Sequence, residues 1–462
     1  MRAPERATAR SMAAAGALLA CVFAAVACDW REFDDLKKKV PVAALEPPGD
    51  YPAGDDFGPI LLEVPPPADK SSAGRFVAAA VYHTSVAVFE FDAAGNPKGT
   101  GLTGTAFDQL GQEPITALAL VPGDKQVLLG APSTTGDFGS LLVMNLDSPF
   151  QTTTFKNVNE GQFGVGVGAG NFGGGAAPEF IVTSSNSLHV YVDGQPNNDS
   201  AYVSAGATDP CPIDFSANLP VLDRANRALI VDTLGTSSMK IAVGTPVAAA
   251  SGGHVAIFDF DAATGAFSCA ALLTGTEAHF GRAMTLVDTD GTGGPDALLV
   301  GAPPTHAYLF TLPLASGQAP VAMATDTMAG GSFGAAVAAF DVDGKAGDEL
   351  FIANPDATAG GKTTAGNVSI YKLSGTALTL LAPTTYPNPL VEHDPKAGNG
   401  YGSGVIGMHF CPGNVAGGAD GGAPTADGGA APPCTDMPLV GSFAKVFAYY
   451  TINSRHTDAR TR

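Results

Sequence analysis

The chain has 462 residues, with 44 acidic and 24 basic side chains and a net charge of −20 at pH 7. Nucleic-acid binding depends on basic side chains that displace counterions from phosphates. The acidic balance therefore argues against a nucleic-acid partner, and it favours solubility. The length alone would suggest two or three ordinary domains, but internal repeats change that count.

The first 27 residues have the pattern of an export signal. Three arginines among the first ten residues precede an uncharged, mainly apolar run over 11–27. Such a run is typical of a signal peptide rather than a structural helix. Small residues before Cys28 resemble a bacterial lipobox, so we expect Cys28 to carry a lipid and to become the first mature residue. Cys21 fits the lipobox better but leaves a shorter apolar run. An ordinary cleaved signal or a membrane span is the alternative.

Residues 28–51 are acidic and then rich in proline, which suits a flexible tether between the lipid and a folded domain. We therefore expect a protein of the cell envelope, held to the outer membrane, on its periplasmic or surface side, by the lipid anchor alone. No later segment approaches the length of a membrane span.

Four of the six cysteines remain after the signal and the lipid site are set aside. An even number in an oxidising compartment suggests two disulfides. Proximity in the sequence favours Cys211–Cys269 and Cys411–Cys434 among the three possible pairings. Free buried thiols are the alternative.

Seven repeats follow one another between residues 52 and 451. Each ends in a short strand-like segment in which apolar residues alternate, and an earlier apolar run precedes it. The final segments are 85–92, 140–147, 187–194, 254–261, 306–313, 367–374 and 444–451. A third strand-like stretch often begins with an FG pair. These pairs are Phe57-Gly58, Phe163-Gly164, Phe280-Gly281 and Phe333-Gly334, with Tyr401-Gly402 as a variant.

The stretch 280–303 resembles an FG-GAP repeat, the unit of the integrin alpha-chain propeller. It has an FG pair, a strand, an acidic glycine-rich loop, a second strand and a GAP triplet. The stretch 333–355 is similar, with ANP in place of GAP, and repeats 1, 3 and 7 are weaker. The resemblance implies an all-β fold, a seven-bladed β-propeller over residues 52–451. A β-solenoid is the alternative, and the single tryptophan, Trp30, argues against WD-repeat propellers.

Two segments at the end of the array have little capacity to form a core. Residues 413–433 are of low complexity and rich in glycine, alanine and proline, so we expect a flexible loop inside repeat 7. Residues 452–462 form a polar tail that we expect to be frayed.

The acidic loop of repeat 5 is the clearest candidate for chemistry. Asp288, Asp290 and Asp296 supply carboxylates, Thr292 supplies a hydroxyl, and glycines allow a sharp turn. Calcium prefers several oxygen ligands on such a loop. FG-GAP loops of this kind bind calcium, so the resemblance implies calcium as a cofactor here. The alternative is a turn in which the aspartates serve only backbone geometry.

The loop of repeat 6 is a weaker candidate for the same ion. Asp341, Asp343 and either Asp348 or Glu349 offer carboxylates, but Lys345 stands where another oxygen is expected. A lysine there removes a ligand and repels a cation. The corresponding loops of repeats 2–4 have lost most carboxylates, and they retain Asp232 in repeat 4 and Asn171 and Glu179 in repeat 3.

Motifs of enzymes occur but lack their context. Residues 330–334 match G-x-S-x-G, yet a strand-like segment follows where a nucleophile elbow needs a helix. Residues 168–173 match G-x-G-x-x-G without a following helix. The eight histidines show no zinc spacing, and the pair His393-Asp394 has no nucleophile beside it.

We therefore expect a binding or adhesion module whose propeller loops meet another protein or a polysaccharide. Two alternatives remain open. One is a scaffold subunit of envelope machinery, and the other is a hydrolase whose site lies in the propeller channel. A cluster of carboxylates, histidine and arginine at one mouth of the channel would favour the hydrolase.

Overall fold

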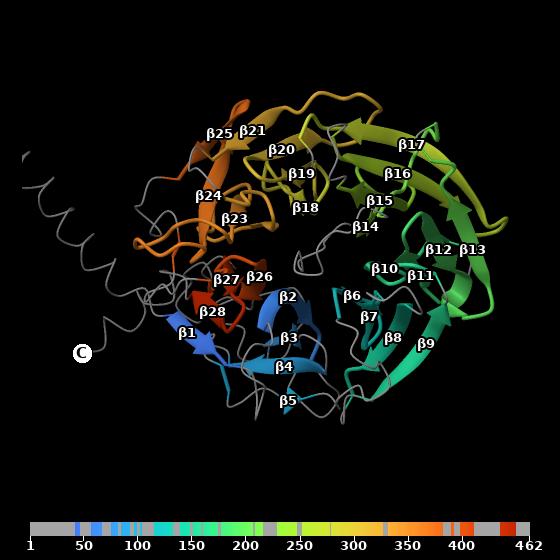
Figure 1. Ribbon diagram of the computed structural model, residues 1–462, viewed down its shortest axis with the longest axis horizontal. Helices are drawn as coiled ribbons and strands as arrows, with labels where there is room; N and C mark the ends of the chain where they lie inside the picture. The colour runs from blue at the N-terminus through green and yellow to red at the C-terminus, as the bar shows by residue number, and fades with distance from the viewer. Residues whose placement is uncertain are drawn as a thin grey trace, which may run out of the picture.

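The computed structural model describes residues 42–46, 57–66, 75–81, 85–92, 97–98, 102–103, 115–132, 139–147, 151–158, 160–173, 177–206, 208–215, 229–246, 252–277, 279–326, 331–381, 390–391, 398–410 and 435–449. These residues form seven four-stranded antiparallel sheets arranged in a ring around a central channel (Figure 1). The prediction of an all-β propeller is confirmed. Within the described part of the chain, no helix is long and apolar enough to cross a membrane.

Each sheet contributes one strand to the wall of the channel, and the other three strands follow outward. The innermost strands are β2 (Phe57–Val64), β6 (Ala117–Leu120), β10 (Gly166–Gly170), β14 (Leu229–Asp232), β18 (Ala283–Val287), β22 (Val337–Phe340) and β26 (Gly404–Phe410). The second strands are β3 (Arg75–Val81), β7 (Gln126–Ala131), β11 (Glu179–Thr183), β15 (Lys240–Thr245), β19 (Ala297–Ala302), β23 (Glu349–Asn354) and β27 (Thr435–Gly441). We number the sheets 1 to 7 in this order.

The outer half of each sheet completes the hydrogen-bonded ladder. The third strands are β4 (Ser85–Phe91), β8 (Gly139–Asn145), β12 (Ser187–Tyr191), β16 (His254–Asp261), β20 (His306–Thr311), β24 (Asn367–Ser374) and β28 (Val446–Tyr449). The outermost strands are β5 (Leu102–Thr103), β9 (Thr152–Val158), β13 (Asp199–Val203), β17 (Ala266–Thr274), β21 (Ala322–Thr325), β25 (Ala377–Leu380) and β1 (Val42–Leu45). A short 3-10 turn, η1 (Val192–Gly194), follows β12.

Sheets 1 to 6 each consist of four consecutive strands, whereas sheet 7 combines both ends of the domain. Strand β1 pairs antiparallel with β28, with Ala43 opposite Ala448. This corrects the predicted tether, because residues 42–45 belong to the propeller. The physical reason is that the edge of β28 needs partners for its backbone groups, and β1 supplies them and closes the ring.

The FG and GAP motifs mark a close approach between neighbouring sheets. A Cβ atom on Gly301 would lie 2.0 Å from the carbonyl oxygen of Gly334, and one on Gly244 would lie 1.9 Å from that of Gly281. Gly281 itself has a φ of +89°, which L side chains rarely adopt. The glycine of one repeat thus leaves room for the FG glycine of the next, while the preceding Phe280 is buried in the core.

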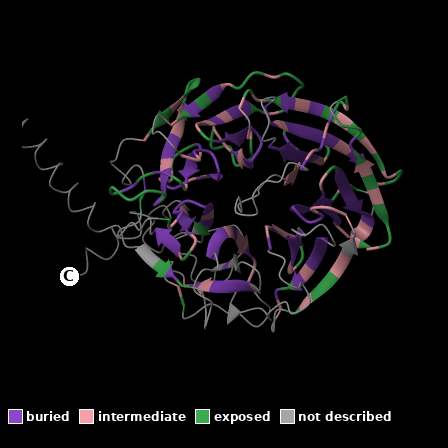
Figure 2. Ribbon diagram, viewed as in Figure 1, coloured by how far each residue is buried: buried purple, intermediate pink, exposed green. Residues whose placement is uncertain are grey.

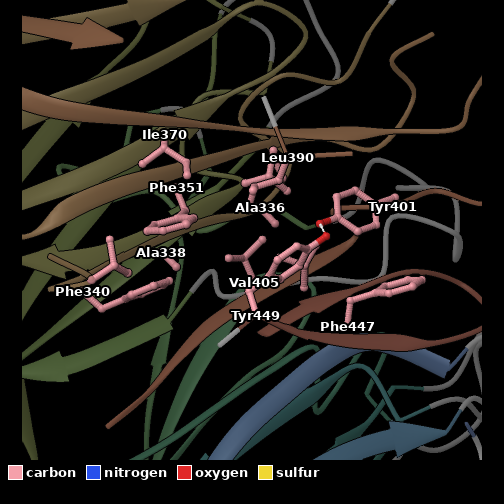
Figure 3. Packing of buried hydrophobic residues seen from close by; sticks show 14 residues of the cluster. Ala336, Ala338, Phe340, Phe351, Ile370, Leu390, Tyr401, Val405, Phe447 and Tyr449 are labelled. Carbon is pink, nitrogen blue, oxygen red and sulfur yellow. Dashed lines mark hydrogen bonds between the residues drawn. The ribbon is translucent and has the colours of Figure 1, made fainter. Parts of the chain in front are cut away.

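Hydrophobic cores fill the spaces between the sheets, and exposed residues lie mainly along the outer rim and the loops (Figure 2). The core between sheets 6 and 7 includes Phe351, Ile370, Val405 and Tyr449 (Figure 3). The hydroxyl groups of Tyr401 and Tyr449 form a hydrogen bond there, which satisfies two polar atoms inside an apolar cluster.

The predicted disulfide Cys211–Cys269 is present, and it links the loop after β13 to strand β17 of the next sheet. Several other predictions lie outside the described residues. These are the signal with Cys21 and Cys28, residues 28–41 and 47–51 of the tether, the pair Cys411–Cys434, the low-complexity segment 413–433 and the tail 452–462.

Candidate functional site

The loop between β18 and β19 contains the strongest predicted calcium ligands. Asp288 accepts backbone hydrogen bonds, with Gly291 N 2.7 Å from Oδ1 and Gly293 N 2.7 Å from Oδ2. Asp290 Oδ1 accepts a further bond from Thr292 N at 2.9 Å. Both carboxylates therefore hold the tight turn in place, which is the role that the alternative interpretation gave them.

Asp296 does not join these two carboxylates. Its Oδ1 accepts a hydrogen bond from Thr289 N at 2.8 Å, and its Oδ2 accepts one from Thr289 Oγ1 at 2.6 Å. The side chain thus closes the base of the loop. Asp288, Asp290, Thr292 and Asp296 are not gathered around one point, and among the described residues the one tight group of three potential ligands lies in sheet 6.

That group consists of Asp341, Asp343 and Glu349, whose carboxylate oxygens lie within 4.8 Å of one another. Two lysines already occupy its surroundings. Lys372 Nζ on β24 lies 2.5 Å from Glu349 Oε1 and 3.6 Å from Asp343 Oδ1. Lys345 Nζ lies 2.6 Å from Asp343 Oδ2. The carboxylates that were predicted to bind a metal are therefore partly neutralised by ammonium groups of the chain itself.

The role of Lys345 was expected from the sequence, whereas that of Lys372 was not. The register of β23 and β24 explains this contact, because Leu350 pairs with Tyr371 and so brings Glu349 beside Lys372. Glu349 is fully buried, so an unpaired charge there would be costly. Burial raises the pKa of Glu349, although the hydrogen bond from Lys372 opposes this rise. Burial also raises the pKa of Asp341.

Asp348 forms hydrogen bonds with the sheet 5 loop. Its Oδ2 accepts a hydrogen bond from Asp288 N at 2.9 Å, and its own N–H donates to Asp288 O at 2.7 Å. Burial, together with the negative charges of Asp288, Asp436 and Glu349, raises the pKa of Asp348 to about 6. Of the two predicted alternatives, Asp348 or Glu349, the structure brings Glu349 beside Asp341 and Asp343, whereas Asp348 faces the neighbouring sheet.

The weaker loops use their polar residues to shape the backbone. Asn171 Oδ1 accepts a bond from Gly173 N at 2.8 Å, and Asp232 Oδ1 accepts one from Leu234 N at 3.2 Å. Glu179 Oε2 accepts one from Phe172 N at 3.0 Å. In sheet 6 Glu349 makes the same contact with Val342 N at 3.0 Å. In sheets 3 and 6, a glutamate at the start of the second strand thus supports the preceding turn.

Sheet 3 contains a buried histidine network that was not predicted from the sequence. Ser187 Oγ lies 2.9 Å from His189 Nε2, and His189 Nδ1 lies 3.2 Å from both carboxylate oxygens of Asp199. These distances and this order match a Ser-His-Asp triad. However, Ser187 is fully buried and also donates to Glu160, which itself lies 3.0 Å from His189 Nε2. The serine is out of a substrate's reach, so the network is structural.

Two carboxylates set the protonation of His189. Burial disfavours the charged imidazolium, but the hydrogen bond and charge of Asp199 and the charge of Glu160 outweigh it and raise the pKa of His189. The ring also stacks on Tyr191 and meets the edge of Phe163. Period-2 spacing along β12 places Ser187, His189 and Tyr191 on one face, and this is the signal that could have revealed the network.

The central channel has a volume of about 690 Å³ and is lined by all seven innermost strands. Most of its lining residues have apolar side chains, and Leu62, Ile230 and Leu286 are partly exposed along it. Glu63, His409 and Asp436 lie at one mouth. His409 Nδ1 is 2.9 Å from Asp436 Oδ1, and His409 N donates to Glu63 Oε2 at 3.3 Å. None of the described lining residues is arginine or lysine.

The enzyme-like motifs take ordinary positions in the fold. Ser332 of the G-x-S-x-G match donates to Asp356, and strand β22 rather than a helix follows it. The G-x-G-x-x-G match, residues 168–173, covers the end of β10 and its turn, and β11 is the next element. The pair His393-Asp394 lies outside the described residues.

No protein-family model and no curated protein sequence matches this chain. Among solved structures, the chain is similar to the β-propeller domain of Cps50 (Swd1) from Myceliophteria thermophila. The two share 11% sequence identity with a TM-score of 0.47, and the match covers 87% of this chain and 99% of that one. A likeness of this size says nothing about function.

Proposed function

We propose that this chain is an FG-GAP-like propeller that acts as a binding module of the bacterial cell envelope, anchored by a lipid at Cys28. Its ligand is a protein or a polysaccharide. The observation that carries the proposal is the acidic face formed by the loops of sheets 5 and 6 and by Asp436 at the start of β27 in sheet 7. The contacts Asp288–Asp348 and Asp341–Asp436 place these three segments side by side.

The acidic face offers more carboxylates than nearby cations. Lys345 and Lys372 pair with Asp343 and Glu349, whereas the described residues of the sheet 5 loop have no lysine or arginine contact. Surface carboxylates of one sign in neighbouring loops attract basic groups of a partner and speed its association. A partner with basic or multiple hydroxyl groups fits this face.

We propose calcium only for the sheet 5 loop, through Asp288 and Asp290. The raised pKa of Asp348, caused by burial and by neighbouring carboxylates that include Asp288, supports this choice, because a cation would relieve the uncompensated charge. In sheet 6 the lysines supply the positive charge instead. The donor set of the sheet 5 loop is incomplete for a strong site, because Asp296 is held by Thr289.

Calcium titration of the full chain tests this part of the proposal. We expect one calcium ion to bind to the wild-type protein and the double variant Asp288→Asn/Asp290→Asn to lose it. Asp341→Asn serves as the matched control in sheet 6 and should keep the ion. Equal loss in both variants, or no binding to the wild type, would contradict the assignment.

Crosslinking on intact cells, followed by pull-down of the full chain with and without a chelator, tests the binding function. The variant Asp288→Asn/Asp290→Asn should lose the partner, whereas Asp147→Asn on another loop should retain it. A partner that survives both the chelator and the variant would favour a scaffold subunit. If no partner is recovered, the binding function is wrong.

A hydrolase with its site in the channel is the second candidate, and the contact between His409 and Asp436 favours it. The described lining residues, however, include no arginine, which was part of the expected cluster. A panel of ester, phosphoester and glycoside substrates tests this candidate. Turnover that disappears in His409→Ala would establish it, and no turnover with any of the three classes would reject it.

A further inference from the structure

The segment 208–215, which we call the strap, lies between sheets 3 and 4 and carries one half of the disulfide. Its Cys211 is bonded to Cys269 on β17, the outermost strand of sheet 4, at the outer rim of the ring (Figure 1). The two cysteines differ in exposure, because Cys211 is fully buried whereas Cys269 is partly exposed. A thiol that approaches from solution therefore meets Cys269 first.

The strap has contacts that do not depend on the disulfide. Ile213 and Phe215 are both buried in the core cluster between sheets 3 and 4. Pro212 O lies 2.7 Å from His254 Nε2 at the start of β16. Phe215 N donates a hydrogen bond to Ser185 O of sheet 3 at 2.6 Å. These contacts hold the strap in place when the bond between the two sulfur atoms is broken.

Each sulfur atom has a hydrogen-bond acceptor beside it that suits the reduced state. Cys211 Sγ lies 3.4 Å from Ala271 O and 3.6 Å from Ile257 O. Cys269 Sγ lies 3.4 Å from Pro210 O. A thiol S–H is a weak donor, and a backbone carbonyl oxygen accepts its hydrogen bond. The folded site therefore accommodates a pair of thiols as well as the disulfide.

We propose that Cys269 is a site of thiol–disulfide exchange, with Cys211 as the buried resolving thiol, and that the dithiol form of the chain stays folded. A thiolate of an external dithiol attacks Cys269 Sγ and forms a mixed disulfide there. The bond to Cys211 breaks, and Cys211 leaves as a thiolate that takes up the proton lost by the attacking thiol. In the reverse direction, Cys211 attacks the mixed disulfide and closes the bond again.

The second thiol of the external dithiol completes the reduction. It attacks the reagent's own sulfur in the mixed disulfide, and Cys269 is released and protonated. The disulfide of the chain thus gains two electrons and two protons, while the dithiol is oxidised to a disulfide. The site lies in sheets 3 and 4, away from the residues of the acidic face, and the inference does not rest on the proposed function.

Reduction of the wild-type full chain in native buffer tests the proposal. Dithiothreitol is added, the chain is then denatured with iodoacetamide present, and the peptides that carry Cys211 and Cys269 are identified by mass spectrometry. We expect both to be alkylated, although circular dichroism before denaturation still shows the folded protein. A bond that opens only in urea would overturn the proposal. With limiting reduced glutathione and an acid quench, the adduct should lie on Cys269, and an adduct on Cys211 would contradict it.

Two matched variants separate exposure from intrinsic reactivity. In folded Cys211→Ser, Cys269 should react with oxidised glutathione about tenfold faster or more than Cys211 does in folded Cys269→Ser, because buried structural thiols are inert. In urea the two rates should become similar. Thermal unfolding verifies that each variant folds, and the wild-type experiment does not depend on them. Equal rates in native buffer would refute Cys269 as the point of attack.

Discussion

The carboxylate of Asp348 accepts a hydrogen bond from the backbone N–H of Asp288, with 2.9 Å between Oδ2 and the nitrogen. Asp348 directly precedes β23, and Asp288 directly follows β18, so the bond joins two neighbouring sheets. One sheet further along, Asp436 and Asp341 repeat this relationship at 3.2 Å. Acidic residues of this propeller therefore connect sheets, in addition to shaping their own loops.

Replacement of Asp348 by asparagine should stabilise the protein at pH 7. The folded-state pKa of Asp348 is raised to about 6, so its charged form opposes folding at neutral pH, and stability rises as the pH falls from about 7 toward 4. The asparagine side chain retains the hydrogen-bond acceptor without the charge. We expect a gain of about 1 kcal/mol at pH 7 after solvent screening is allowed for.

Urea unfolding of the wild type and Asp348→Asn at pH 5 and pH 7, both with a chelator present, measures this effect. The difference between the two proteins should be smaller at pH 5, where Asp348 is largely protonated. An equal difference at both pH values would show that the charge of Asp348 has no influence on folding.

Replacement of His189 by glutamine should destabilise the protein most at mildly acidic pH. The pKa of His189 is raised in the folded state, so its contribution is fully present below its ordinary value of about 6.5. The contribution is lost as the pH rises through the folded-state pKa. We expect His189→Gln to cost about 1.5–3 kcal/mol at pH 6, because Glu160 and Asp199 lose a charged donor.

The free energy of unfolding of this variant, followed from pH 6 to pH 9, checks the assignment. The gap from the wild type should narrow as the pH rises. His409→Gln, at an exposed histidine that also contacts an aspartate, is the control and should cost less at pH 6. A gap that is constant with pH would mean that His189 is neutral throughout.

Replacement of Lys372 by methionine should destabilise the protein by about 3 kcal/mol. The change leaves the buried carboxylate of Glu349 without its cation, and breaking a buried ion pair from one side costs this much. Lys345→Met is the matched control, because Lys345 is 73% exposed and its pair with Asp343 should contribute less than about 1 kcal/mol.

A double variant shows whether charge is the cause. Lys372→Met/Glu349→Gln removes both partners and should recover much of the lost stability in urea unfolding. If the double variant is no more stable than Lys372→Met, the loss arises from packing of the lysine side chain rather than from the uncompensated carboxylate.

Removal of the disulfide by Cys211→Ala/Cys269→Ala should lower the free energy of unfolding by about 2–4 kcal/mol. The two cysteines are 58 residues apart, so the bond restricts a long loop in the unfolded chain. Guanidinium unfolding of the purified variant and the wild type gives the difference. Identical midpoints and slopes would mean that the bond does not constrain the unfolded state.

Much of the fold was readable from the sequence because its signals are local. Alternation of apolar residues in 254–261 and 306–313 predicted β16 and β20, since successive side chains in a strand point to opposite faces. The pair Phe280-Gly281 was recognisable because a buried aromatic and a glycine with positive φ are needed at the same place in the repeat. The pairing Cys211–Cys269 followed from proximity along the chain.

The candidate sites were decided by contacts between segments far apart in sequence. The spacing of Asp288, Asp290 and Asp296 fits a metal loop, but hydrogen bonds from Thr289 orient the side chain of Asp296. The contact of Asp348 with Asp288 depends on how the two neighbouring sheets pack. The pairing of Lys372 with Glu349 depends on the register of β23 and β24.

The sequence by itself determined the repeat array, many of its strands and the recurring FG and GAP glycines, because side-chain periodicity and backbone sterics act within one repeat. Only the tertiary structure decided the closure of sheet 7 by β1, the buried network of His189 and the charged mouth of the channel. These features depend on the register between strands and the distance between sheets. Such quantities are set by packing around the whole ring, and no single segment encodes them.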